Sequence, residues 1–200
     1  MNIITKLRRQ RWIFLGRRKI KKSIQSSKIT KVILGAGYET PVPEGWIATD
    51  IPHFDITKES DWDFFFSEEK IDHLLAEHVL EHITEQDVAK VLNLAHKYLK
   101  KGGTFRIAVP DGWNKDPDYI KRVKPPADGH LSYWNLKSLK DILEKRHFEV
   151  KEIEYCNEQG ELTLTEFNFN NGIILRSKAK GFKSKYVENY NSLIVDALKK

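Results

Sequence analysis

Two glycines and one acidic residue form the clearest pattern of chemical meaning in this sequence. Gly35 and Gly37 follow the apolar run Val32–Leu34, and Asp50 follows a second apolar run, Trp46–Ala48. Glycine lets the backbone approach a ligand closely, and a carboxylate accepts hydrogen bonds from ribose hydroxyls. A strand, a glycine turn, a second strand and an acid are typical of Rossmann-type sheets. The pattern therefore predicts an adenosine cofactor site.

This pattern differs from the dinucleotide-binding fingerprint in two respects. The third glycine of G-x-G-x-x-G is missing, and only eight residues, 38–45, separate the two apolar runs. Neighbouring parallel strands usually need a crossover of about a dozen residues or more, and Pro41 and Pro43 disfavour a full helix here. Taken alone, residues 31–50 leave two interpretations open, a shortened adenosine site and no cofactor site.

A second pattern raises the question of a metal. The run His78-Val-Leu-Glu81-His82 matches H-x-x-E-H, a signature of zinc peptidases. That chemistry needs both histidines on one face of a helix, with a distant third ligand. Here His78 directly follows the apolar run 71–76 and is expected at the end of a strand. The single cysteine, Cys156, adds no reason to propose zinc, so we predict no metal site.

Alternating strand and helix patterns must position these residues, which predicts an α/β fold. Strands are predicted over 31–36, 46–51, 71–76, 104–109, 148–155 and 172–175. Helices are predicted over 85–99, 135–145 and 192–198. Residues 53–69 are expected to form a loop around one further edge strand, and residues 111–131 a long polar loop.

The charge distribution divides the chain in two. Residues 1–28 hold ten Lys or Arg and no acid, whereas residues 29–200 hold 24 basic and 28 acidic residues. The N-terminal segment therefore carries +10 and the rest of the chain −4, so the basicity belongs to the N-terminal segment. With 200 residues and 40% hydrophobic content, we predict a basic arm, 1–28, followed by one domain, 29–200. A single cysteine excludes an internal disulfide, and we expect a cytoplasmic protein.

The basic arm allows three interpretations. Its longest apolar run, Trp12–Leu15, is too short for a transmembrane helix or a secretory signal. One interpretation is a transit peptide, since the arm is rich in arginine and free of acid. Another is a surface arm attracted to anionic lipid or another polyanion, which would make the protein peripheral at a membrane. The third is a solvated basic helix that packs Trp12, Ile13 and Phe14 on the domain.

Three further segments carry a resemblance to a known family. They are AEHVLEHI (76–83), LKKGGTFRIAVPD (99–111) and GHLSYWNLKSLKDILEKRHFEV (129–150). Together with LGAG and GWIATD, they resemble the class I S-adenosylmethionine-dependent methyltransferases, especially the small bacterial methyltransferase type 11 domains. The resemblance covers roughly residues 30–155. Its most specific part is the order helix, Leu-Lys-x-Gly-Gly, strand, Pro-Asp.

The resemblance implies a fold, a cofactor and a reaction. The fold would be a Rossmann-like, seven-stranded, mostly parallel sheet with helices on both faces and an antiparallel last strand. The cofactor would be S-adenosylmethionine, and the reaction would be methyl transfer.

The resemblance also implies a role for eight positions. The glycine turn would lie along the methionine part of the cofactor, and Asp50 would bind the ribose hydroxyls. Asp55 would bind the adenine amino group, while Glu77 and His78 would line the methyl-donor pocket. The positions that match the family's cofactor contacts are Gly35, Ala36, Gly37, Asp50, Ile51, Asp55, Glu77 and His78.

Methyl transfer to a hydroxyl or amine also needs a group that removes a proton. Asp111, after the strand over 104–109, and His130, in the following loop, are candidates for this base. His82 is a third candidate that would face the substrate. The alternatives are structural: a turn or cap for Asp111, a bond to the backbone for His130, and a hydrogen bond at a helix start for His82.

The sequence says less about the acceptor. Trp113, Tyr119 and Trp134 would either form an aromatic wall for a sugar or ring, or cover the edge of the sheet. Arg176 would either meet an anionic acceptor or form a surface ion pair. We predict a small-molecule or carbohydrate-like acceptor that is methylated at oxygen.

Two alternatives remain for the function as a whole. One is a nucleic-acid methyltransferase tethered by its basic arm. The acidic domain and the missing Asn/Asp-Pro-Pro-aromatic motif argue against it, so we find no strong nucleic-acid signal. Cys156 is also outside any loop suited to a cytosine nucleophile. The other alternative is a non-catalytic binding module that keeps the fold and has lost the cofactor.

Overall fold

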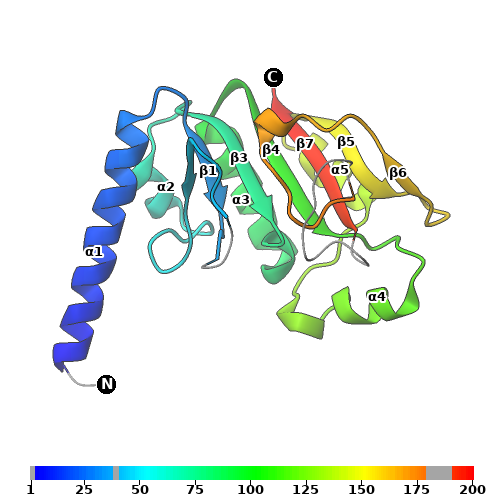
Figure 1. Cartoon of the computed structure of the whole chain (residues 1–200), viewed down its shortest axis with the longest axis horizontal. Coiled ribbons are helices and arrows are strands. Elements are labelled where there is room, and N and C mark those ends of the chain that lie inside the picture. The colour runs from blue at the N-terminus through cyan, green and yellow to red at the C-terminus, as the bar shows by residue number, and fades with distance from the viewer. Residues whose placement is uncertain (1–2, 38–40, 179–190) are drawn as a thin grey trace.

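A seven-stranded sheet forms the centre of the computed structural model, which describes residues 3–37, 41–178 and 191–200 (Figure 1). The strand order is β2-β1-β3-β4-β7-β5-β6. Strands β1 to β5 run in the same direction, and β6 and β7 run in the opposite one. The predicted mostly parallel sheet with an antiparallel last strand is confirmed. The strands are β1 (Lys31–Leu34), β2 (Trp46–Ala48), β3 (Ile71–Glu77), β4 (Leu99–Pro110), β5 (Phe148–Cys156), β6 (Leu162–Leu164) and β7 (Ser192–Lys199).

Five α-helices and three short 3₁₀ turns accompany the sheet in the described part of the chain. Side chains of α2, α3 and α5 join those of alternate strand residues in the larger core, on one face of the sheet. The predicted helices over 85–99 and 135–145 are confirmed as α3 and α5. The helical elements are α1 (Ile3–Ser26), α2 (Glu59–Phe65), η1 (Leu80–His82), α3 (Glu85–Tyr98), α4 (Pro117–Val123), η2 (Ala127–Gly129), α5 (Leu136–Glu144) and η3 (Phe169–Asn171).

Local capping explains where the two central helices begin. The side chain of Thr84 accepts a hydrogen bond from the backbone N–H of Asp87 at the start of α3. At the start of α5, Asn135 and Ser138 form a reciprocal capping box. These side chains satisfy N–H groups that have no partner within a helix, which fixes the first turn.

The opposite face of the sheet carries an irregular segment, residues 165–178. Phe167 and Ile174 of this segment pack on alternate strand residues such as Ile33 and Leu75 in a second, smaller core. The guanidinium of Arg106 in β4 donates from Nη1 to the carbonyls of Asn168 (2.8 Å) and Gly172 (2.6 Å). The predicted strand over 172–175 is therefore wrong. In the described part of the chain, backbone polar groups of residues 172–175 form hydrogen bonds with side chains of the sheet, and not with the backbone of a neighbouring strand.

The C-terminal run is a strand and not the predicted helix over 192–198. As β7 it lies between β4 and β5, and Ser192 to Ala197 are all buried. A central strand that is covered on both faces is apolar at nearly every position, so its sequence resembles that of a short buried helix. Its one acid, Asp196, lies opposite Arg106 and pairs with it.

Two predicted loops contain helices. Residues 53–69 hold α2 and no further strand, because Trp62 and Phe65 turn into the larger core. Residues 111–131 hold α4, which begins with an Asp116 cap followed by Pro117. Pro is compatible with the first helical position and Asp is a favoured cap, so this start signal was present in the sequence.

The basic arm forms α1, whose C-terminal half packs beside α2 and β2. Ile24 is buried, and the Arg17 guanidinium donates to Asp61 and to the carbonyl of His53, both at 2.9 Å. A Cβ at Gly16 would lie 2.3 Å from the His53 ring, so glycine permits this close approach. The N-terminal half extends away from the sheet (Figure 1).

This arrangement corrects part of the packing expected for the arm. Phe14 is 57% exposed and Trp12 is 49% exposed, although Trp12 contacts the ring of His53 edge-on. The anchoring side chains lie further along the helix than predicted. No helix of the described residues is both long enough and apolar enough to span a membrane.

Candidate functional site

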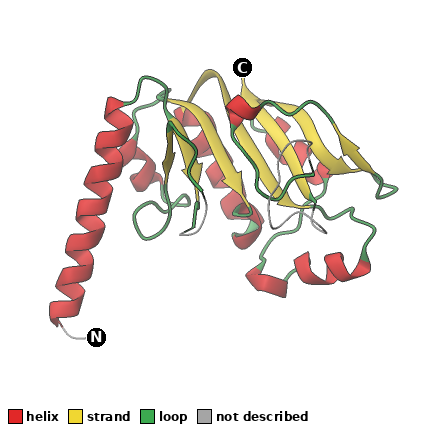
Figure 2. Ribbon diagram, in the orientation of Figure 1, coloured by secondary structure: helices red, strands yellow, loops and turns green. Residues whose placement is uncertain are grey.

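The loops that follow β1, β2, β3 and β4 gather at the carboxyl ends of the parallel strands (Figure 2). The glycine turn after β1 lies at this edge, with Gly35 at φ 61° and Gly37 at φ 64°. Such angles are in the left-handed region that favours glycine. A Cβ on Gly35 would also come within 2.7 Å of the Val79 side chain. The turn therefore requires glycine for both its backbone angle and its packing.

Asp50 closes the glycine turn from the end of β2. Its Oδ2 accepts from the N–H of Gly37 (3.0 Å) and its Oδ1 accepts from the N–H of Ile51 (2.8 Å). The N–H of Ala36 donates to the carbonyl of Thr49 (3.0 Å), which joins the turn to β2. The structure thus brings together five of the predicted cofactor positions.

These residues fit the adenosine part of S-adenosylmethionine. Each carboxylate oxygen of Asp50 accepts one backbone hydrogen bond and keeps a further lone pair, and the side chain is partly exposed. Two spare acceptors suit the two hydroxyls of a ribose. Beside them, Ile51 is 64% exposed and offers apolar surface to a ring.

The short link between β1 and β2 does not prevent this arrangement. The two strands pair in parallel, and residues 41–45 contain no helix. Residues 38–40, which include Thr40, lie outside the described residues.

The carboxylate of Asp55 forms hydrogen bonds and an ion pair within the turn that follows it. Its carboxylate accepts from the N–H (3.1 Å) and hydroxyl (2.7 Å) of Thr57 and pairs with Lys58 (2.9 Å). Burial alone would raise the pKa of Asp55, but the bonds from Lys58 and Thr57 lower it below its usual value. Its contact with adenine stays a prediction.

Glu77 and His78 join β3 to other parts of the chain. The Glu77 carboxylate accepts from the N–H groups of Leu175 (2.9 Å) and Arg176 (2.8 Å). His78, at φ 54°, bonds through Nδ1 to Glu81 and through Nε2 to Ser192, both at 2.9 Å. In this structure both side chains organise the end of β3, and their contact with the cofactor stays a prediction.

Asp111 is buried under the loop that follows β4. Its exposure is 0%, and its carboxylate accepts from the N–H groups of Trp113 and Cys156. Burial raises the pKa of Asp111, and these two hydrogen bonds lower it only in part. These contacts favour the structural alternative for Asp111, since its carboxylate is covered from solvent.

His82 and His130 lie side by side, although they are far apart in the sequence. Their ring centroids are 4.9 Å apart. The carbonyl of Glu81 accepts from the N–H groups of Leu131 (2.7 Å) and Ser132 (3.1 Å), which fixes the loop after η2 against η1. His82 is exposed and His130 is buried, so the pair reaches from the interior to the surface.

The predicted aromatic wall does not form as a unit. Tyr119 is fully buried, and its hydroxyl donates to the carbonyl of Asn191 (2.8 Å). Trp134 is 3% exposed and donates from Nε1 to Ser132 (2.8 Å). Only Trp113 of the three is partly exposed. Tyr119 and Trp134 are therefore buried and do not form an open wall, while the alternative that they cover the edge of the sheet stays a prediction.

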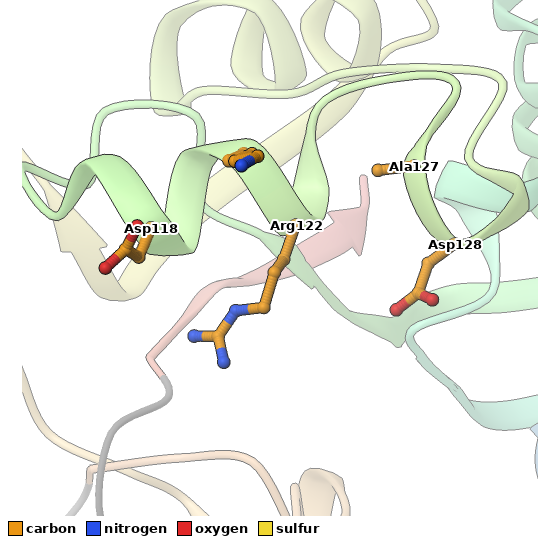
Figure 3. A pocket seen from close by; sticks show the side chains of 5 residues that line it. Asp118, Arg122, Ala127 and Asp128 are labelled. Atoms are coloured by element: carbon orange, nitrogen blue, oxygen red, sulfur yellow. The ribbon is translucent and has the colours of Figure 1, made fainter.

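Two further features of the structure lie outside the predicted site residues. Glu81 is 1% exposed and stands between His78 and the pair of His82 and His130. Its place in the V-L-E-H run was the available signal. The second feature is an open pocket of about 560 Å³ at α4 and η2. In Figure 3, Arg122 and Asp128 flank it; its lining residues are Asp118, Lys121, Arg122, Ala127 and Asp128.

Comparison with family models identifies the protein family that contains this chain. Residues 28–153 match the model described as a methyltransferase domain. The chain belongs to this methyltransferase family. The match spans the glycine turn, Asp50, His82 and His130. The predicted family and its cofactor, S-adenosylmethionine, are thereby confirmed.

Solved structures share the fold of this methyltransferase at low sequence identity. A SAM-dependent methyltransferase from Archaeoglobus fulgidus has 16% identity and a TM-score of 0.50, with 94% of each chain covered. A possible histamine N-methyltransferase from Thermotoga maritima has 14% identity and a TM-score of 0.51, covering 99% of this chain and 96% of that one. The CurJ carbon methyltransferase has 14% identity and a TM-score of 0.53, covering 88% and 50%. Comparison with curated proteins found no match.

Proposed function

We propose that this methyltransferase transfers a methyl group to a hydroxyl oxygen of a small or carbohydrate-like acceptor. The observation that supports the proposal is an exposed imidazole, His82, which follows β3 and lies beside a buried one, His130, from the segment after β4. An oxygen acceptor must lose a proton during the transfer, and an imidazole is suited to accept it near neutral pH.

The cofactor half of the site is assigned to the turn at Gly35–Gly37 and to Asp50. When bound, S-adenosylmethionine supplies a methyl group on a positively charged sulfur. Asp50 holds the ribose hydroxyls through its spare lone pairs while it fixes the turn through Gly37 and Ile51. The same carboxylate would thus hold both the glycine turn and the ribose.

The acceptor half of the site is assigned to the histidine pair. His130 bonds through Nδ1 to the carbonyl of Val123 (2.6 Å), which fixes its ring and limits it to a positioning role. Among the residues that the structure describes, the His82 ring makes one long polar contact, 3.5 Å from its Nδ1 to the carbonyl oxygen of Gly129. Its ring is therefore less constrained and is the better candidate to accept the proton of the acceptor hydroxyl.

A labelling experiment tests this function. The protein is incubated with methyl-labelled S-adenosylmethionine and a panel of saccharides and hydroxylated aromatic compounds. We expect an alkali-stable methyl ether, and we expect His82→Asn to lower kcat by about 10²-fold or more without weakening cofactor binding. The matched control is His147→Asn, at an exposed position away from the pair. Methylation of nitrogen only, or full activity of His82→Asn, would contradict the proposal.

We also propose that α1 attaches the protein to anionic membrane surfaces. This helix has no acidic residue in its first turn, and residues 1–28 hold ten basic residues without an acid. Its exposed apolar side chains supply the surface that would enter the lipid boundary; they are Leu7, Trp12, Phe14 and Leu15.

Sedimentation with vesicles tests this attachment. The full chain should bind vesicles that contain phosphatidylserine, and binding should fall as salt is raised. The double variant Phe14→Ser/Leu15→Ser should bind several-fold less, because it loses apolar surface and keeps every charge. Leu162→Ser, at an exposed leucine of β6, is the matched control. Equal binding of the double variant and the wild type would refute an insertion of this face.

A further inference from the structure

Two buried carboxylate oxygens have no hydrogen-bond partner among the described residues, Oε1 of Glu154 in β5 and one at the end of β3. The second is Oε2 of Glu81, a residue that is only 1% exposed. Leaving such an acceptor unpaired costs about 1–3 kcal/mol, and more for a charged group. One ligand atom from each of Glu81, His82 and His130 lies within 4.8 Å of the other two. The residue that carries the unpaired oxygen therefore belongs to a cluster of side chains of the types that bind metals.

Hydrogen bonds hold one polar atom of His130 and one of Glu81, and this leaves the other polar atom of each side chain for a metal. His130 uses Nδ1 to bond the carbonyl of Val123 at 2.6 Å, which leaves Nε2 for another partner. Histidines that bind metals usually donate their other ring nitrogen to a carbonyl or carboxylate in this way. Glu81 likewise uses Oε1 to bond His78 at 2.9 Å and keeps Oε2 for another partner.

We propose that Glu81, His82 and His130 bind one divalent transition-metal ion, with Zn²⁺ as the best match. Imidazole and carboxylate are common zinc ligands, and zinc sites with three protein ligands keep a fourth position open. Ligands about 2.0 Å from a tetrahedral zinc ion lie about 3.3 Å apart, so the cluster must contract by up to roughly 1.5 Å. The exposed ring of His82 has the freedom to make that movement.

This set differs from the zinc peptidase pattern considered for the same residues. In H-x-x-E-H both histidines of the motif would be ligands. Here His78 bonds to Glu81 and Ser192, and the third ligand, His130, comes from a distant loop. A bound ion would tie η1 to the loop after η2. It would also occupy the lone pair that the proposed function assigns to His82, so one molecule cannot use both roles at once.

Zinc binding is measured without cofactor or acceptor, so failure of the proposed function would leave this test unaffected. Metal-free, tag-free protein is titrated with Zn²⁺ against a chromophoric chelator. We expect one Zn²⁺ per chain. We expect His82→Asn to weaken binding by more than the roughly 10–100-fold that loss of an outer partner costs. Glu81→Gln should weaken binding comparably while it keeps the side-chain volume.

A matched control separates this site from casual binding by surface histidines. His147→Asn changes an exposed histidine that lies near His96 and has no part in the cluster. It should bind Zn²⁺ like the wild type. Three results would each overturn the proposal: no stoichiometric binding by folded protein, unchanged binding by His82→Asn, or an equal loss in His147→Asn. Because His82 is exposed, the variant at that position is expected to fold even if Glu81→Gln does not.

Discussion

A fully buried guanidinium, that of Arg106, connects β4 and β7 with the segment that covers them. Its Nε and Nη2 each donate to Asp196 at 2.7 Å, and its Nη1 donates to two carbonyls of residues 165–178. The ring of Phe167 lies 4.3 Å from the guanidinium carbon. A buried ion pair of this kind adds little net stability, but removing one partner leaves an uncompensated charge.

Asp196→Asn should therefore lower the free energy of unfolding by about 3 kcal/mol. Urea denaturation measures the change. Asp141→Asn, at an exposed position of α5, is the control and should stay within about 0.5 kcal/mol of the wild type. Equal stability of Asp196→Asn and the wild type would mean that the pair contributes no structural constraint.

Glu154 in β5 gives the stability a pH dependence. Burial raises the pKa of Glu154, although hydrogen bonds from Ser177 and Lys178 lower it in part. In the unfolded chain a glutamate has its ordinary pKa of about 4.3. Because the pKa of Glu154 is higher in the folded chain, the folded chain keeps this proton to a higher pH. The contribution to stability is full below the unfolded pKa and is lost as pH rises through the raised pKa.

Glu154→Gln cannot ionise and should reduce this loss. The free energy of unfolding, measured in urea at several pH values from about 4.5 to 7, should decline less in the variant than in the wild type. Parallel curves for the two proteins would show that Glu154 does not titrate differently in the folded state.

At the scale of elements, the Arg17 side chain connects α1 to the rest of the domain through several contacts. Arg17 bonds to Asp61 and to the carbonyl of His53, and its guanidinium carbon lies 4.5 Å from the centre of the Phe64 ring. Further along, Ile24 is buried in the larger core. Residues 5–11 of α1 are exposed, so they are available to meet another surface while the C-terminal half stays in place.

Arg17→Ala should loosen α1 without unfolding the sheet. Hydrogen bonds to charged groups contribute about 1.5–3 kcal/mol each, so amide exchange in α1 should accelerate by roughly tenfold or more. Hydrogen-exchange mass spectrometry resolves this from exchange in β4 and β7, which should not change. The control is Arg18→Ala, whose side chain is exposed and contacts only Phe14 among the aromatic rings described. Unchanged amide exchange of α1 in Arg17→Ala would show that contacts other than those of Arg17 hold this helix on the domain.

Elements with strong local signals could be predicted from the sequence. Thr84 and the apolar face of α3 indicate one helix, and its predicted end at residue 99 differs by one residue from the observed end at Tyr98. The run Ser192–Lys199 could not be assigned, because a central strand and a buried helix have the same apolar composition. Its assignment depends on β4 and β5, with Arg106 lying opposite Asp196 at a separation of 90 residues.

At the scale of the whole molecule, the site is assembled from segments that are distant in the sequence. Gly37 and Asp50 could be paired from the sequence, because strand, turn and acid follow each other within one motif. The meeting of His82 and His130 depends on the loop after η2 folding back on η1, which no local pattern encodes. The burial of Asp111 was equally hidden, since it requires β5 to supply the N–H of Cys156.

The central claim is that Asp50 and the glycine turn hold S-adenosylmethionine. Isothermal titration with S-adenosylmethionine and S-adenosylhomocysteine tests it most directly, with Asp50→Asn as the variant and Asp141→Asn as the control. We predict that the wild type and the control bind both compounds, and that Asp50→Asn binds them about 10- to 100-fold more weakly, because hydrogen bonds to a charged acceptor are lost. Unchanged affinity in a folded Asp50→Asn variant, or no binding by the folded wild type, would contradict the account.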